Sequence, residues 1–355
     1  GTIRVGNGTL TSSLGSGAVV NNSALSINVP ASITIANAIS GTGSVEIAGG
    51  AVTLSGNNSY TGGTTLSGGV LVLGSANAIA TTGALNFAGG TLQYTANNTT
   101  DYSARFSNAA GQQYAVDTNG QDITYATALS SAGGTFDKYG LGTLTFASNN
   151  TYSGVTTIAA GVVQLGAGST TGSMGTGAVV NGGTIAYNHS NDIVLSNAIS
   201  GAGSLTQAGT GLLTLTGDNA YTGTTTINVG RRLQVGNNTS TGSLGLSALI
   251  NNGTLIVNRS NAITMPNNMS GTGTISQIGS GTLTLTGNNT YSGGVSVTNA
   301  GLMLGSHNAL GTAATVTSSG ASLGVVSGTL IDGLTVNGNV TLMADITSTG
   351  AQLYN

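Results

Sequence analysis

The sequence predicts an all-β protein that winds as a β-helix, in which successive coils of the chain stack on one another. Glycine accounts for 60 of the 355 residues, well above the roughly 7% of average proteins. The helix-forming residues Glu and Lys occur once each, at Glu46 and Lys138, whereas Thr, Ser, Asn, Val and Ile are abundant. Because β-branched residues favour strands and Gly and Asn favour turns, we expect short strands joined by tight corners.

A motif that occurs four times divides the chain into repeats. Four tyrosines each lie two residues after an Asn and two residues before a Gly, and they are 92, 69 and 70 residues apart. The first spacing exceeds the others by about 22 residues, which is also the distance from Asn197 to Asn219. We therefore expect a unit of about 70 residues with three or four coils, and one extra coil in the second unit. The residues expected at the repeated corners are Asn58, Tyr60, Gly62, Asn150, Tyr152, Gly154, Asn219, Tyr221, Gly223, Asn289, Tyr291 and Gly293.

The alternation of side chains within the motif predicts how a coil is built. In residues 281–287, Leu283 and Leu285 share one face and three threonines the other, which is the period of a half-buried strand. A single coil can bury its inner face only against its neighbours, and about 15–20 such coils would form an elongated rod. Gly and Asn at the strand ends are expected to adopt the positive φ of a sharp corner. The corresponding inward pairs are Val52 and Leu54, Leu144 and Phe146, and Leu213 and Leu215.

The repeats predict a single continuous β-helix over residues 1–355. Its units are approximately 1–70, 71–160, 161–230, 231–300 and a divergent last unit, 301–355, with the extra, irregular coil at 94–139. Residues 1–7 match residues 231–237, so the chain is expected to begin inside a unit and to be a fragment of a longer protein.

The motif also resembles that of a known family. The run at 279–294, with variants at 49–63, 140–154 and 209–223, resembles the passenger-associated repeat of bacterial autotransporters. Residues 323–355 look more like large filamentous-haemagglutinin-type exoproteins. The resemblance implies a right-handed parallel β-helix, exported across the Gram-negative outer membrane by its own or a partner's barrel and located outside the cell or at its surface. It also implies a role in adhesion or biofilm cohesion.

Charge and composition exclude several classes of function. Six Lys and Arg against nine Asp and Glu give a net charge of −3, which is not the basic footprint of a nucleic-acid-binding protein. No apolar run approaches the roughly 20 residues that cross a bilayer, so we expect no membrane insertion. The chain contains no Cys and no acidic calcium-binding loop, so no metal and no cofactor is expected. No residue is predicted to be catalytic.

Two alternatives to an adhesin stay open. Polysaccharide-degrading β-helix enzymes need two carboxylates close together, and stacked coils could bring Asp101 near Asp122, which is 21 residues away. The simpler interpretation of these residues is two solvated turn aspartates. The other alternative is a spacer stalk without a ligand of its own.

Residues 94–139 contain five of the eleven tyrosines and four of the nine acidic residues. Aromatic faces beside polar groups are typical of sugar- or protein-binding surfaces, so Tyr102, Tyr114 and Tyr125 are the candidate binding residues. The alternative is an irregular coil with a side loop.

The four repeat tyrosines are instead expected to pack over their own corners with their hydroxyls at the solvent. The expected partners are a polysaccharide, a host surface or a second rod, since low charge weakens self-repulsion.

Overall fold

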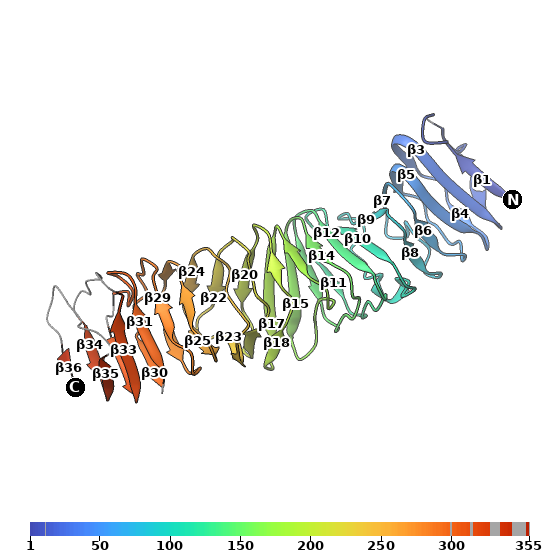
Figure 1. Ribbon diagram of the computed structural model, residues 1–355. Coiled ribbons are helices and arrows are strands. Elements are labelled where there is room, and N and C mark those ends of the chain that lie inside the picture. Colours follow the sequence, from blue (N-terminus) through green and yellow to red (C-terminus); the bar gives the residue numbers. More distant parts are fainter. Residues whose placement is uncertain (11, 299, 313–314, 327–333, 343–352, 355) are drawn as a thin grey trace. The chain divides into compact units, whose positions relative to one another are not determined.

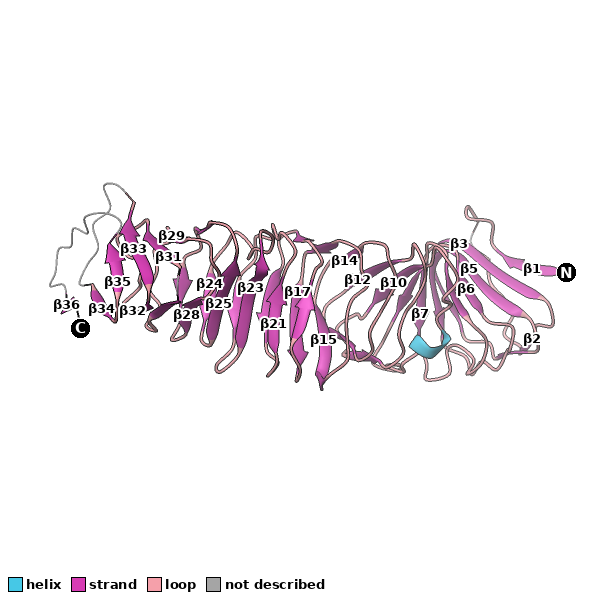
Figure 2. Ribbon diagram, turned by 60° about the horizontal axis from the view of Figure 1, so that its bottom comes forward, coloured by secondary structure: helices cyan, strands magenta, loops and turns pink. Residues whose placement is uncertain are grey.

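A computed structural model describes residues 1–10, 12–298, 300–312, 315–326, 334–342 and 353–354. Over these described residues the chain winds as a β-solenoid with about 16 turns in all. Nearly all of its regular structure is parallel strand (Figure 1). Within the described ranges the one helix is the single-turn 3-10 helix η1 (Ser103–Arg105) (Figure 2), and no helix there could cross a bilayer. The predicted all-β coil is confirmed.

The chain divides into two compact units. The first comprises residues 1–167 and 171–183, and the second comprises 168–170 and 184–355. The strands of the first unit are β1 (Thr2–Val5), β2 (Val19–Val20), β3 (Ala24–Ile35), β4 (Ile39–Ser40), β5 (Ser44–Leu54), β6 (Thr64–Leu66), β7 (Val70–Leu73), β8 (Leu85–Phe87), β9 (Thr91–Gln93), β10 (Gln113–Asp117), β11 (Ile123–Tyr125), β12 (Thr135–Tyr139), β13 (Thr143–Phe146), β14 (Thr156–Ile158), β15 (Val162–Ser169) and β16 (Val179–Asn181). The last two residues of β15 are assigned to the second unit.

The strands of the second unit are equally short. They are β17 (Thr184–His189), β18 (Ile193–Leu195), β19 (Ile199–Ser200), β20 (Ser204–Gln207), β21 (Leu212–Leu215), β22 (Thr225–Ile227), β23 (Arg232–Thr239), β24 (Leu249–Asn251), β25 (Thr254–Arg259), β26 (Ile263–Met265), β27 (Met269–Ser270), β28 (Thr274–Gln277), β29 (Leu283–Leu285), β30 (Val295–Thr298), β31 (Gly301–Leu304), β32 (Thr315–Ser319), β33 (Ala321–Val325), β34 (Thr335–Asn337), β35 (Val340–Leu342) and β36 (Leu353–Tyr354). Residues 327–333, 343–352 and 355 lie outside the described ranges, so most of the stretch that resembles filamentous-haemagglutinin-type proteins is not described.

Sheets form between coils, because each strand pairs with a strand about one coil further along the chain. In the first unit the longest sheet has the order β1-β3-β5-β7-β9-β10-β12-β14-β16, beside β11-β13-β15 and the pair β2-β4. In the second unit the order is β18-β21-β23-β25-β28-β30-β32-β34-β36 in one sheet, β17-β20-β22-β24-β27 in another and β26-β29-β31-β33-β35 in a third.

The core of each unit is a column of inward side chains in register. In the second unit the column passes from β21 to β34 through residues that are at most 1% exposed. These residues are Leu213, Leu233, Leu255, Ile275, Val295, Val316 and Val336. The inward pairs predicted from the repeats, such as Leu283 and Leu285, are fully buried. Each coil is thus covered by its neighbours, as stacking requires.

The marker glycines are required for close packing rather than for a left-handed backbone. None of Gly62, Gly154, Gly223 and Gly293 has a positive φ, so the expected reason for these glycines is wrong. A Cβ on Gly62 would lie 2.5 Å from the carbonyl carbon of Gly43, and one on Gly154 would lie 2.5 Å from the carbonyl oxygen of Gly134. The backbone of the preceding coil occupies the space of a side chain at these corners.

We expect Gly62→Ala to lower the free energy of unfolding by about 1–3 kcal/mol, because the added methyl group forces two coils apart. Gly17→Ala is the matched control, since a Cβ at Gly17 meets no atom within 4 Å and its φ is not positive. Chemical denaturation of both variants measures the difference. Equal stabilities would contradict the close approach at Gly62.

Candidate functional site

The asparagine of each repeat marker is buried and joins three coils. The side chain of Asn58 accepts the Ile39 N–H at 2.9 Å and donates to the Ala78 carbonyl at 2.6 Å. Both partners lie about 20 residues away, one in the preceding coil and one in the following coil. Equivalent bonds are made by Asn150 with Leu129 and Ser173, by Asn219 with Ile199 and Ser243, and by Asn289 with Met269 and Ala309. These asparagines are structural, because each buried amide links its own coil to the coils on both sides.

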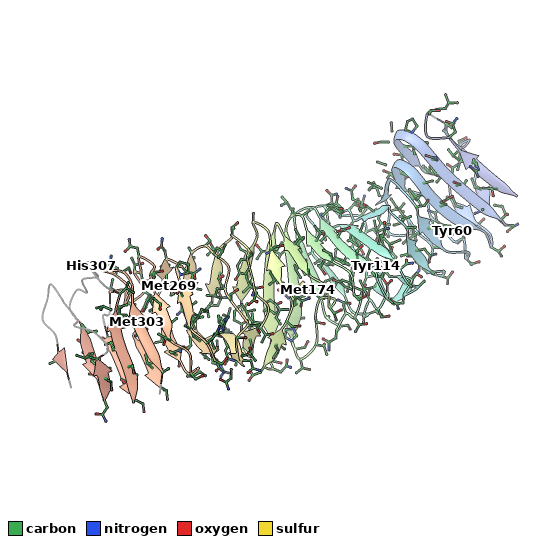
Figure 3. The ribbon with its side chains drawn as sticks, viewed as in Figure 1. Tyr60, Tyr114, Met174, Met269, Met303 and His307 are labelled. Carbon is green, nitrogen blue, oxygen red and sulfur yellow. The ribbon has the colours of Figure 1, made fainter. Side chains whose placement is uncertain are left out.

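The repeat tyrosines point inward. Tyr60, which is labelled in Figure 3, is 0% exposed, as are Tyr152, Tyr221 and Tyr291. The prediction that their hydroxyls reach the solvent is therefore wrong. In the first three copies the hydroxyl shares a 2.7 Å hydrogen bond with a buried threonine four residues later, and in the fourth it donates to the Ala309 carbonyl. Burial raises the pKa of Tyr60 and of Tyr152 to about 12. The tyrosines therefore fill the column and cannot bind a ligand at the surface.

A polar side chain interrupts the apolar column at the same position of three repeats. Lys138 is 0% exposed, and its ammonium donates to the carbonyls of Tyr139, Gly140 and Ala160 at 2.7–3.2 Å. Burial lowers its pKa to about 8. At the equivalent positions Gln207 and Gln277 donate to carbonyls two and four residues later. These donors satisfy corner carbonyls that the strand ladder leaves open, a role that the sequence analysis did not recognise.

The tyrosine-rich segment 94–139 forms an aromatic core rather than an aromatic surface. Tyr114 and Tyr125 are 0% exposed, so the expectation that they line a binding surface is wrong. The Tyr125 hydroxyl lies 3.2 Å from that of Tyr94, and the Tyr114 hydroxyl donates to the Ser107 carbonyl at 2.7 Å. Ring centroids 4.7–6.5 Å apart connect Phe87, Phe106, Tyr114, Tyr125, Phe136, Phe146 and Tyr152.

Tyr102, at 6% exposed, lies at the edge of this segment and lines a surface hollow of about 300 Å³. Its hydroxyl exchanges hydrogen bonds with the Asn98 amide, and its ring centroid is 5.7 Å from the Arg105 guanidinium carbon. The residues that line the hollow are Ala76, Asn77, Ile79, Thr81, Thr100, Asp101, Tyr102 and Arg105. Of the three candidate binding residues, Tyr102 is the one that contributes to an open site.

The acidic residues of this segment cap backbone groups. The Asp101 carboxylate accepts the N–H groups of Ser103 and Ala126 at 2.8 and 2.9 Å, and the Asp122 carboxylate accepts that of Thr143 at 2.7 Å. These bonds fit two turn aspartates, and no hydrogen bond between the two carboxyl groups is present. Within the described ranges, no three His, Asp or Glu side chains are grouped closely enough to hold a metal ion.

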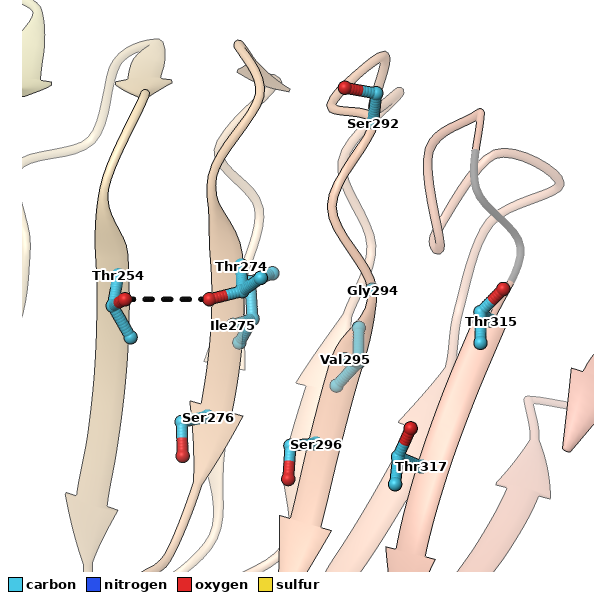
Figure 4. Close-up of a pocket in the computed structure, with 10 residues that line it drawn as sticks. All are labelled: Thr254, Thr274, Ile275, Ser276, Ser292, Gly294, Val295, Ser296, Thr315 and Thr317. Carbon is cyan, nitrogen blue, oxygen red and sulfur yellow. Dashed lines mark hydrogen bonds between the residues drawn. The ribbon is translucent and has the colours of Figure 1, made fainter. Parts of the chain in front are cut away.

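A second hollow, of about 600 Å³, lies on the outer face of β25, β28, β30 and β32 in the second unit (Figure 4). Thr274 donates to the Thr254 hydroxyl at 3.4 Å, and Gly294 leaves a gap in the row of threonines that continues at Thr315. Its ten lining residues, which carry hydroxyl and apolar groups, include no charged side chain.

Comparison with known families identifies the repeat. The family model of the passenger-associated-transport-repeat matches residues 40–73, 136–165, 205–235 and 275–303. Four segments of the chain are thus similar to the passenger-associated-transport repeat. This finding confirms the four copies predicted from the sequence and is consistent with an autotransporter passenger domain, a class that is secreted. No curated protein and no solved structure matches the chain.

We expect Lys138→Gln, which installs the side chain of the third and fourth repeats, to remove a pH dependence of stability. Because the pKa of folded Lys138 is about 8 and that of an unfolded lysine is about 10.4, the unfolded chain holds more protons between these values. Wild-type stability should therefore rise relative to the variant between about pH 8 and pH 9.5. Urea denaturation of both proteins across this pH range measures the difference in their free energies of unfolding. If the two free energies changed with pH in the same way, a buried, partly neutral Lys138 would be contradicted.

Tyr187 provides a test of the buried hydroxyls, because its own hydroxyl has no hydrogen-bond partner among the described residues. We expect Tyr187→Phe to leave stability unchanged or to raise it, since only an unpaired polar atom is removed. Tyr221→Phe, in the same unit, should lower the free energy of unfolding by about 1–3 kcal/mol, because it leaves the Thr225 hydroxyl unpaired. Thermal unfolding of the two variants should separate them, and a larger loss for Tyr187→Phe would contradict this assignment.

Proposed function

We propose that this chain is a contact-making segment of a secreted or surface-anchored bacterial adhesin. It would attach cells to a polysaccharide or a host surface, or join neighbouring cells in a biofilm. The observation that carries the proposal is the fourfold passenger-associated-transport repeat within a self-stacked coil. This repeat is found in exported passengers, which supports a role outside the cell and export through an outer-membrane barrel.

The coil supports a mechanical role. Buried polar side chains such as Asn58 and Lys138 hydrogen-bond to its own backbone. Its surface charge is low, which allows close approach to another uncharged or like-charged surface. A spacer stalk without a ligand is the alternative that shares these features, whereas an enzyme would need reactive groups that these contacts do not supply.

Attachment of beads coated with the chain tests the proposal. Beads carrying the full chain should adhere to polysaccharide-coated glass or to one another more than beads carrying albumin at equal density. A spacer stalk would give the albumin level in both assays, which would overturn the proposal. Release of reducing ends from the polysaccharide during incubation would instead indicate a carbohydrate-active enzyme.

A further inference from the structure

The hollow beside Tyr102 in the first unit holds a cation without a counter-ion. Arg105 is half-buried and supplies the one positive charge among the eight residues that line the hollow, and Asp101, which forms no ion pair with it, supplies the one negative charge. Within the described ranges no carboxylate lies within ion-pair distance of Arg105, whereas Arg232 lies 3.5 Å from the Asp192 carboxylate. A partly desolvated charge without a counter-ion is unfavourable even when carbonyls accept its N–H groups, and an anionic ligand would relieve that cost.

The guanidinium is held rigidly and still has donors to offer. It donates through Nε to the Gly83 carbonyl at 2.8 Å, through Nη2 to Thr82 at 2.7 Å and through Nη1 to Ala80. An arginine carries five N–H groups, so one on each terminal nitrogen is left for a ligand. Two N–H groups from one planar group match the two oxygens of a carboxylate.

The rest of the rim offers acceptors and hydroxyl groups. Asp101 is exposed, and each of its oxygens accepts only one backbone N–H, which fixes the carboxylate and leaves lone pairs for hydroxyl donors. Asn77, Thr81 and Thr100 add exposed polar side chains. A hollow of about 300 Å³ lies at the small end of the range for ligand sites, which suits one or two sugar rings.

We propose that this hollow binds an acidic sugar of a polysaccharide, with the sugar carboxylate on Arg105 and its hydroxyls on Asp101 and Asn77. The proposal rests on the proposed function, because it names the polymer that the adhesin contacts. A neutral sugar would leave the Arg105 charge uncompensated, and a simple inorganic anion would leave the hydroxyl acceptors unused. Nucleic acid, which is bound by many clustered cations, does not fit a hollow with a single arginine.

The test is calorimetric titration of the purified full chain with trigalacturonate and, in parallel, with neutral maltotriose. We expect trigalacturonate to bind at least about tenfold more tightly and to weaken as salt rises, since part of the attraction is between charges. Thr81→Trp should fill the hollow and reduce binding at least about tenfold. Thr99→Trp is the matched control, because Thr99 is an exposed threonine nearby that neither lines the hollow nor bonds to Arg105, and this variant should bind as the wild type does.

Substitution of Arg105 itself is avoided, because the three carbonyls that it caps would lose their donors. Circular dichroism should show the same strand signal for both tryptophan variants. Equal binding of the two trisaccharides, equal binding by Thr81→Trp, or full competition by acetate would each overturn the proposal. If bead attachment persists while trigalacturonate fails to bind, only the acidic-sugar site is wrong. If trigalacturonate binds but beads do not attach, the site stands and the adhesive function is wrong.

Discussion

Each coil of this protein lacks an interior of its own, and most features of the structure follow from that constraint. An inward side chain is buried only when the coils on both sides place a suitable side chain in register with it. The column from Leu213 to Val336 satisfies this condition with aliphatic residues of similar size. The corners must also bring backbone against backbone, and the marker glycines meet that demand because a Cβ would overlap the preceding coil.

Tight corners interrupt the strand ladder and leave carbonyls and N–H groups that water cannot reach, so the column must supply polar partners from within. The marker asparagines serve the coils on both sides, and Lys138, Gln207 and Gln277 serve the corner that follows their own strand. The first repeat shows the converse case. There β5 runs without interruption from Ser44 to Leu54, and the equivalent position holds the fully buried Ile47.

The coil could be predicted from the sequence, because the alternation of apolar and polar side chains and the length of the repeat are both visible in the sequence without a structure. It did not reveal which polar residues point inward. Tyr60, Tyr152 and Tyr221 each have a threonine four residues later, and this Tyr-x-x-x-Thr spacing was the available signal for a buried pair. Tyr291 has Val295 at that place and hydrogen-bonds to the next coil instead. Tyr114 and Tyr125 were misread because an irregular coil has no repeat from which their direction can be inferred, although Tyr102 does reach an open hollow.

The same reasoning indicates where contact chemistry is to be sought. Within the repeats, the asparagines bind the backbone of neighbouring coils, most of the tyrosines pair with a buried threonine, and the glutamines bind the corner after their own strand. These buried side chains therefore have little capacity to bind anything else. Polar side chains that can still form hydrogen bonds to a ligand occur where the chain departs from the repeat. One example is η1, which brings Arg105 beside Tyr102. A repeat that satisfies itself can be copied without changing what the protein binds, whereas a single irregular coil can add a ligand without disturbing the stack. Specificity in such a protein is therefore expected to reside in its irregular coils, and length in its repeats.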